Sequence, residues 1–179
     1  MIDIVDNYLP EQGFFNIFNQ MKEFSFDWHL STIINTKNPL YDPYTAEELV
    51  GNMQLCHVFY RAHQNNARTF PLLTPVLEKL DPVALIRIKA NLSLSTKGIM
   101  EGGMHIDVED EDTPDCVRTS ILYMNTNDGY TLFEDGTKVE SVMNRLVTFP
   151  CTMKHAGTTC TNAPFRMVIN FNYITGTKL

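Results

Sequence analysis

His105 and Asp107 are residues whose types and spacing suggest metal chemistry. In an extended strand, residues two apart point to the same face, so this imidazole and this carboxylate can reach one ion at about 2.0 to 2.2 Å. His155 follows an expected strand, Leu146 to Phe149, and a chain that doubles back can return it to the side of His105. Two histidines and one carboxylate form a facial triad that leaves three positions of an octahedral Fe(II) open.

Arg166 lies on the last expected strand, Phe165 to Tyr173. A period of two puts Arg166, Val168 and Asn170 on one face of this strand and a row of apolar residues on the other. An arginine opposite an apolar face either lies in solvent or binds a buried anion. Its planar fork suits bidentate recognition of a carboxylate better than the point charge of a lysine does.

The acidic run Glu109 to Asp112 directly follows the H-x-D motif. Such a run is most often a solvated loop. The functional alternative is a lid over the metal that selects a cationic or polar substrate.

The second half of the chain is expected to be rich in strands. From Ala84 to Leu94, apolar residues alternate with Arg87, Lys89 and Asn91, whose polar face either lies in solvent or lines a pocket. Turn sequences containing Asp-Gly separate the later strands. These strands are expected at Val117 to Asn125, Tyr130 to Phe133, Thr137 to Val142, Leu146 to Phe149 and Phe165 to Tyr173.

The first half of the chain is expected to be helical. Helices are predicted over Pro10 to Glu23, from the capping-box sequence at Thr45 to about Leu55, and over Leu73 to Leu80. The whole chain, 1–179, is predicted to be one domain, with helical support over about 1–82 and a β core over about 83–175. The predicted fold class is mainly β with flanking α-helices, as a double-stranded β-helix or cupin-like jelly roll.

Composition excludes several classes of protein. With 44% hydrophobic and 20% charged residues the chain is a globular one, and it has no apolar run of the roughly 18 residues that span a bilayer. The net charge of −7 argues against nucleic acid as a partner. The 4 cysteines form no C-x-x-C pair, and the first residues are acidic where a secretory signal carries Lys or Arg, so a cytoplasmic location is expected.

The order of these motifs resembles that of the Fe(II)- and 2-oxoglutarate-dependent dioxygenases, in particular the prolyl 4-hydroxylase-like branch. The resemblance covers half of the chain, from about Ala84 to Tyr173. It consists of the H-x-D motif, then Leu122-Tyr123-Met124-Asn125, Thr148-Phe149-Pro150, His155-Ala156-Gly157 and Phe165-Arg166. The resemblance implies that Fe(II) is held by His105, Asp107 and His155, which with Arg166 would be the catalytic residues.

The same resemblance implies a binding site for 2-oxoglutarate. Arg166 would bind the distal carboxylate, and Tyr123 would donate its hydroxyl to the same group. Asn170 stands four residues after Arg166, where some members of the family have an assisting threonine. Ile121, on the same strand face as Tyr123, would form the apolar wall of this pocket.

The implied activity is hydroxylation of a prolyl residue in a peptide or protein, with O2 as oxidant, decarboxylation of 2-oxoglutarate to succinate and CO2, and ascorbate as an optional reductant. One alternative is a 2-oxoglutarate oxygenase that acts on a nucleic-acid base or a small molecule. Another is a jelly roll that binds metal without catalysis, because a fold does not determine a function. A cupin-type enzyme without 2-oxoglutarate is disfavoured by Arg166 and Tyr123.

Overall fold

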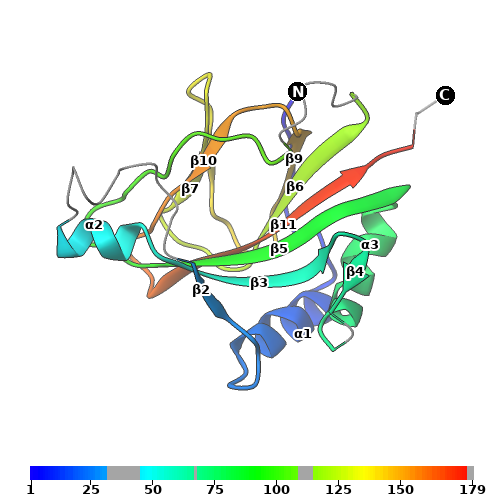
Figure 1. Ribbon diagram of the computed structural model, residues 1–179, viewed down its shortest axis with the longest axis horizontal. Helices are drawn as coiled ribbons and strands as arrows, with labels where there is room; N and C mark the ends of the chain where they lie inside the picture. The colour runs from blue at the N-terminus through cyan, green and yellow to red at the C-terminus, as the bar shows by residue number, and fades with distance from the viewer. Residues whose placement is uncertain (32–44, 67, 109–114, 177–179) are drawn as a thin grey trace.

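The computed structural model describes residues 1–31, 45–66, 68–108 and 115–176. Two antiparallel sheets form the body of the molecule (Figure 1). The larger sheet has eight strands and follows the order β1-β9-β6-β11-β5-β3-β2, with β4 paired to β3. Its strands are β1 (Asp3–Val5), β2 (His29–Ser31), β3 (Gln54–Arg61), β4 (Gln64–Asn65), β5 (Ala84–Leu94), β6 (Val117–Tyr123), β9 (Leu146–Pro150) and β11 (Phe165–Ile174).

The smaller sheet has three strands in the order β10-β7-β8 and lies across one face of the larger one. Its strands are β7 (Tyr130–Phe133), β8 (Lys138–Glu140) and β10 (His155–Gly157). Apolar side chains fill the space between the two sheets, among them Ile121, Val147 and Val168 from the larger sheet and Phe133 and Val139 from the smaller. The predicted jelly-roll architecture, mainly β with flanking helices, is confirmed.

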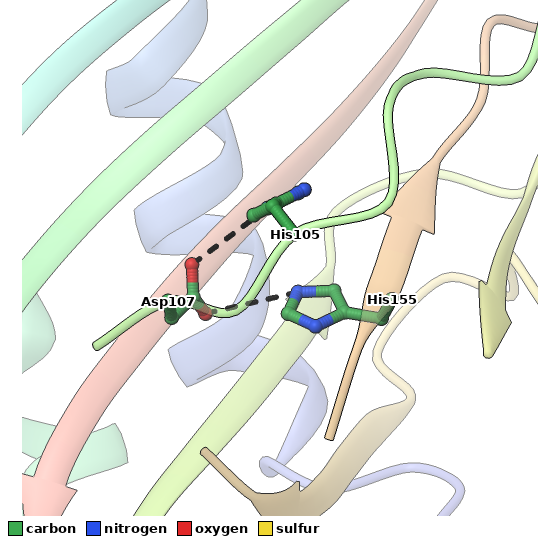
Figure 2. Close-up of side chains that lie close together, drawn as sticks. All are labelled: His105, Asp107 and His155. Atoms are coloured by element: carbon green, nitrogen blue, oxygen red, sulfur yellow. Dashed lines mark ion pairs between the residues drawn. The ribbon is translucent and has the colours of Figure 1, made fainter. Parts of the chain in front are cut away.

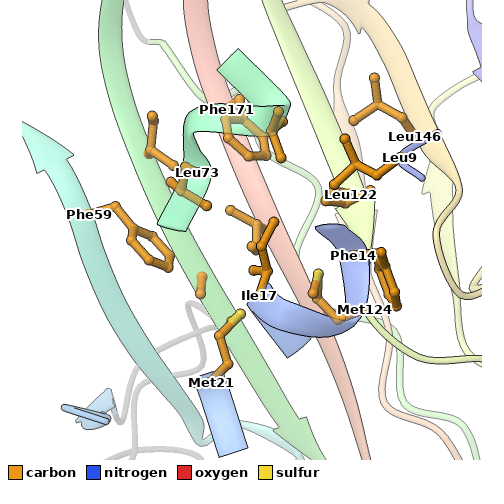
Figure 3. Packing of buried hydrophobic residues seen from close by; sticks show 14 of the residues in the cluster. Leu9, Phe14, Ile17, Met21, Phe59, Leu73, Leu122, Met124, Leu146 and Phe171 are labelled. Atoms are coloured by element: carbon orange, nitrogen blue, oxygen red, sulfur yellow. The ribbon is translucent and has the colours of Figure 1, made fainter. Parts of the chain in front are cut away.

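Helices cover the other face of the larger sheet. They are α1 (Glu11–Lys22), the 3-10 helix η1 (Phe70–Leu73) and α3 (Thr74–Leu80), while α2 (Ala46–Gly51) lies apart from this layer (Figure 1). Figure 3 shows Phe14, Ile17 and Met21 of α1 in the main apolar cluster with Leu73 and Phe171. Burying a side chain of this size is worth about 1.5 to 3 kcal/mol, so this layer holds the sheet that carries the site.

The two central strands carry different chemistry on their two faces. On β11, Met167, Ile169 and Phe171 join the helix-covered core, as the period of two predicted. Arg166 and Asn170 therefore face the smaller sheet, and they line a cavity there. The polar residues that alternate along β5 line the same cavity. Of the two alternatives for the polar face of this strand, solvent or a pocket, the structure therefore shows the pocket.

The predicted helix from Thr45 to about Leu55 is too long. The helix ends at Gly51, and β3 begins at Gln54 and pairs with β5. β-branched and aromatic residues within β3 favour this sheet pairing over a helical continuation. The side chain of Glu48, the last residue of the predicted capping box, lies outside the described residues.

The other predicted elements agree with the structure to within two residues at their ends, including Thr137 to Val142, which is β8. The sequence patterns did not predict strands β1 to β4 or β10. Within the described part of the chain, no helix combines the length and apolar character needed to cross a bilayer.

His57 on β3 is a buried histidine outside the cavity, with 1% of its surface exposed. Its Nδ1 lies 2.8 Å from the carbonyl of Asp27, and its Nε2 lies 2.8 Å from the hydroxyl of Thr69. A carbonyl only accepts, so Nδ1–H donates to Asp27 and Nε2 accepts from Thr69. Burial lowers the pKa of His57, although the hydrogen bond to Asp27 opposes this shift.

We expect His57 to make the stability of the protein pH-dependent. Because its pKa is lower in the folded state, the unfolded chain binds more protons below about pH 6.5, and the free energy of unfolding falls as the pH falls through that range. Urea unfolding of His57→Asn at pH 7.5, 6 and 5 should show a shallower decline than the parent. The exposed His63→Asn is the control, and equal slopes for parent and His57→Asn would contradict this assignment.

Candidate metal centre and adjoining cavity

The backbone places His105 and His155 opposite each other. The two residues form an isolated antiparallel bridge, in which each N–H donates to the other's carbonyl at 3.0 Å. His155 begins β10, and His105 lies in the segment that follows β5. As a result the two imidazole rings lie side by side, with centroids 4.7 Å apart.

Asp107 faces both imidazoles from one side (Figure 2). Its Oδ1 is 3.9 Å from Nε2 of His105, and its Oδ2 is 3.8 Å from Nε2 of His155. An ion bonded to two such atoms at about 2.0 to 2.2 Å spans up to about 4.4 Å between them, so both separations are within its reach. The structure therefore brings together the three residues that the H-x-D motif and the late histidine suggested.

Both histidines present an unprotonated nitrogen to this centre. Nδ1 of His105 lies 2.9 Å from the carbonyl of Gly103, and Nδ1 of His155 lies 3.1 Å from the carbonyl of Met153. Because a carbonyl can only accept, each Nδ1 carries the proton and each Nε2 keeps its lone pair. Metal-binding histidines are commonly oriented in this way.

Three side chains of the larger sheet hold Asp107. Arg87 donates Nη2–H to Oδ1 at 2.8 Å, Asn172 donates Nδ2–H to Oδ2 at 3.0 Å, and the hydroxyl of Thr119 donates to Oδ2 at 3.2 Å. Arg87 also donates Nε–H to the side-chain oxygen of Asn172 at 3.0 Å. These contacts fix the carboxylate, whose side chain is only 3% exposed.

The protonation states of the centre suit a cation. Burial alone raises the pKa of Asp107, but its electrostatic interactions with His155 and Arg87 and the Asn172 hydrogen bond outweigh it and lower the pKa overall. Burial lowers the pKa of His155, although Asp107 opposes this shift. Both directions favour the ionised carboxylate of Asp107 and the neutral imidazole of His155. Together with His105, these side chains are the donor set that divalent iron takes in facial-triad proteins.

Arg166 is a buried cation without a carboxylate partner among the described residues. Its side chain donates to the hydroxyls of Ser141 at 2.7 Å and Thr131 at 3.1 Å. Burial lowers the pKa of this guanidinium, and the aromatic ring of Tyr123 lies 5.5 Å from its central carbon. A side chain at Gly129 would come within 2.8 Å of Cδ of Arg166, so a glycine there leaves room for the arginine.

Tyr123 does not reach the cavity that Arg166 lines. Its hydroxyl donates to Thr131 at 2.7 Å, and burial raises its pKa, so the group stays a donor. Because Thr131 accepts from both Tyr123 and Arg166, its own hydroxyl hydrogen is available to a ligand. Of these two residues, Thr131 lines the cavity and Tyr123 lies behind it.

One cavity of about 480 Å³ joins the metal centre to Arg166. Ile121 forms part of its wall, as the sequence suggested, together with Val168. Asn170 lines the middle of the cavity, is 8% exposed, and has no hydrogen-bond partner for Oδ1. The predicted site residues thus line a single space, except Tyr123, and the predicted acidic lid, Glu109 to Asp112, lies outside the described residues.

Sequence reasoning missed the side chains that hold the predicted ones. These are Thr119 and Asn172 at Asp107, and Thr131 and Ser141 at Arg166. Asn172 carried a signal, because it continues the cavity-facing row of Asn170 on the last strand. Thr131 lies on β7 and Ser141 directly after β8, so neither belongs to the larger sheet. The pattern of a single strand cannot predict their contact with Arg166.

Solved structures share this architecture, although no protein-family model and no curated protein sequence matches the chain. A Trichoplax adhaerens prolyl hydroxylase in complex with a hypoxia-inducible factor peptide superimposes with a TM-score of 0.60, at 12% identity, over 97% of this chain and 83% of that one. A Pseudomonas putida prolyl-4-hydroxylase gives a TM-score of 0.54 at 15% identity, over 98% and 93%. The chain has the fold of these oxygenases.

The same fold also carries a different reaction. The non-heme, alpha-ketoglutarate-dependent epimerase SnoN of nogalamycin biosynthesis superimposes with a TM-score of 0.62 at 12% identity, over 98% of this chain and 78% of that one. At this level of identity the likeness concerns the fold, and the chemistry has to be argued from the side chains of this chain.

We expect His155→Ala and Asp107→Ala to lose tight binding of Fe(II) while the fold persists, because each change removes one of three ligand atoms. Anaerobic equilibrium dialysis measures the affinity, and circular dichroism monitors the fold. The exposed His29→Ala is the matched control and should bind iron like the parent. Parent-like affinity in either cavity variant would show that the ion is held elsewhere.

Proposed function

We propose that this protein is an Fe(II)- and 2-oxoglutarate-dependent oxygenase that hydroxylates a prolyl residue in a peptide or protein. The observation that carries the proposal is the combination, in one cavity, of the His105, Asp107 and His155 cluster with the buried, carboxylate-free Arg166. A dianionic co-substrate that chelates a metal at one end and has a carboxylate at the other fits both features.

The bound iron, 2-oxoglutarate and O2 would supply the oxidation, with succinate and CO2 as co-products and ascorbate as an optional reductant. The chain's part is to bind, orient and exclude water. His105 and His155 present Nε2 lone pairs, and Asp107 is fixed beside them by its hydrogen bonds. These fixed donors hold the ion without rearrangement.

Arg166 would bind the distal carboxylate of 2-oxoglutarate, and the hydroxyl hydrogen of Thr131 would add a second donor. Tyr123 acts behind this pair, because it donates to Thr131 and its ring covers the guanidinium. Ile121 and Val168 would pack against the carbon chain of the co-substrate and keep water away. A charge pair in such dry surroundings is stronger than the same pair in water.

The choice of a prolyl substrate rests on the fold relatives, two of which are prolyl hydroxylases and one of which was solved with a peptide. The net charge of −7 disfavours a nucleic-acid substrate. The proposal includes a cytoplasmic location, with which four unpaired cysteines are consistent.

Arg166→Met should weaken binding of 2-oxoglutarate by roughly two to four orders of magnitude, since losing one partner of a buried charge pair costs about 3 to 5 kcal/mol. The ligand-free variant should be at least as stable as the parent, because an uncompensated buried charge is removed. Anaerobic titration with 2-oxoglutarate, following the visible band of the Fe(II) complex, measures the first effect, and thermal unfolding measures the second. The exposed Arg68→Met is the control. Unchanged affinity in Arg166→Met would overturn this role.

The substrate class is tested by offering proline-containing peptides and methylated single-stranded oligonucleotides side by side. We expect a mass gain of one oxygen on a peptide and no loss of methyl groups from the oligonucleotides. Binding of a neutral peptide should hardly respond to salt, whereas binding through phosphates weakens steeply. Demethylation without peptide oxidation would replace the prolyl substrate by a nucleic-acid base and leave the co-substrate assignment intact.

A further inference from the structure

The cavity is more positive than the protein around it. Among the described residues that line it, Arg87, Lys89 and Arg166 are cationic, and Asp107 is the one acidic residue. The whole chain, by contrast, has a net charge of −7. A local excess of positive charge in an acidic protein indicates a place where an anion is bound.

Two of these three cations already have a partner or a proposed one. Arg87 is paired with Asp107 at 2.8 Å, and Arg166 is assigned to the distal carboxylate of the co-substrate. Lys89 makes no hydrogen bond or ion pair with any described residue, although it lines the cavity and is only partly exposed. Its ammonium group is therefore available to a ligand.

The position of Lys89 separates it from the proposed co-substrate wall. β11 lies between β6 and β5 in the larger sheet, so Lys89 on β5 and Ile121 on β6 flank Asn170 from opposite sides. Ile121 and Thr131, on one side of β11, line the path from the metal centre to Arg166. Lys89 lies on the other side, in the part of the cavity that remains for the primary substrate.

Asn170 is a second, independent sign of a ligand beside Lys89. It is directly paired with Lys89 across the two strands, is more than nine-tenths buried, and lines the cavity. Its Oδ1 has no hydrogen-bond partner, which is costly for a buried polar atom. An ammonium group has three donors, so Lys89 can donate to this oxygen and to a bound carboxylate together.

We propose that Lys89, with Asn170 beside it, binds a carboxylate of the primary substrate. This inference rests on the proposed function, since it takes the Arg166 end of the cavity to be filled by 2-oxoglutarate. The carboxylate has two sources in a prolyl substrate, which are an acidic side chain next to the proline and a free carboxyl terminus at the proline itself.

The experiment uses two matched probe pairs that differ in one charge. N-acetylproline and N-acetylprolinamide test the terminal carboxylate, and the N-acetylated amides of Glu-Pro and Gln-Pro test the side chain. Binding is measured by calorimetry on protein loaded with Zn(II), which accepts the same ligands without oxygen chemistry, and saturated with 2-oxoglutarate. The readout is an affinity, so it does not depend on turnover.

We expect the charged member of at least one pair to bind about tenfold more tightly than its neutral partner in the parent protein. Lys89→Met should reduce this ratio to about one, Lys89→Glu should invert it, and neither should change the affinity for 2-oxoglutarate. Lys22→Met removes the same charge from α1, beneath the opposite face of the sheet, and should keep the parental ratio. The pair that shows the preference identifies the source of the carboxylate.

Three results would overturn the inference. The first is that the parent shows no charge preference or no detectable binding of the probes. The second is a charge preference that persists in Lys89→Met. The third is a loss of 2-oxoglutarate affinity in Lys89→Met like that in Arg166→Met. Failure of the proposed function is a separate result, because it appears as an absence of 2-oxoglutarate binding or of succinate formation in the iron-loaded parent.

Discussion

The two backbone hydrogen bonds between His105 and His155 are the constraint on which the site depends. Through β10, His155 belongs to the smaller sheet, whereas His105 lies on the segment that leaves the larger one. Their bridge joins the two, and two residues later the chain delivers Asp107 to side chains of β5, β6 and β11. The centre therefore lies where the two sheets meet. Main-chain pairing places the two histidines, and side-chain hydrogen bonds from the larger sheet hold Asp107.

Electrostatics explains why this junction is organised around two arginines. Asp107 is buried, and a buried carboxylate without compensation would take up a proton, so Arg87 and Asn172 keep it charged. Arg166 has the opposite problem, because it is buried with hydroxyl partners and no described carboxylate. A cation in that state destabilises a fold by several kcal/mol, and such costs are typical of sites whose missing partner is a ligand.

The sequence predicted those features that follow from the residue pattern of a single strand. The alternation along β5 and β11 predicted which face is apolar, and the spacing of His105 and Asp107 predicted a shared centre. The structure places the Tyr123 hydroxyl against Thr131 of the smaller sheet, and no strand pattern contains that pairing. The three-residue strand β10 was missed because its pairing with β7 makes it extended, and no local pattern shows that pairing. Strand β3 was missed although its β-branched and aromatic residues favour an extended chain.

The two sides of the cavity differ in chemical character, and this difference bears on which reaction the protein would catalyse. The side formed by β6 and β7 combines Ile121 and Thr131 with the buried Arg166, an arrangement suited to a short dicarboxylate. The side formed by β5 is polar along its length and has Lys89 in the middle. Proteins with this same fold include hydroxylases and an epimerase, so the fold alone does not select the outcome. Under the proposed function, the group that holds the primary substrate would select the outcome, and the β5 side with Lys89 is where we propose that group to lie.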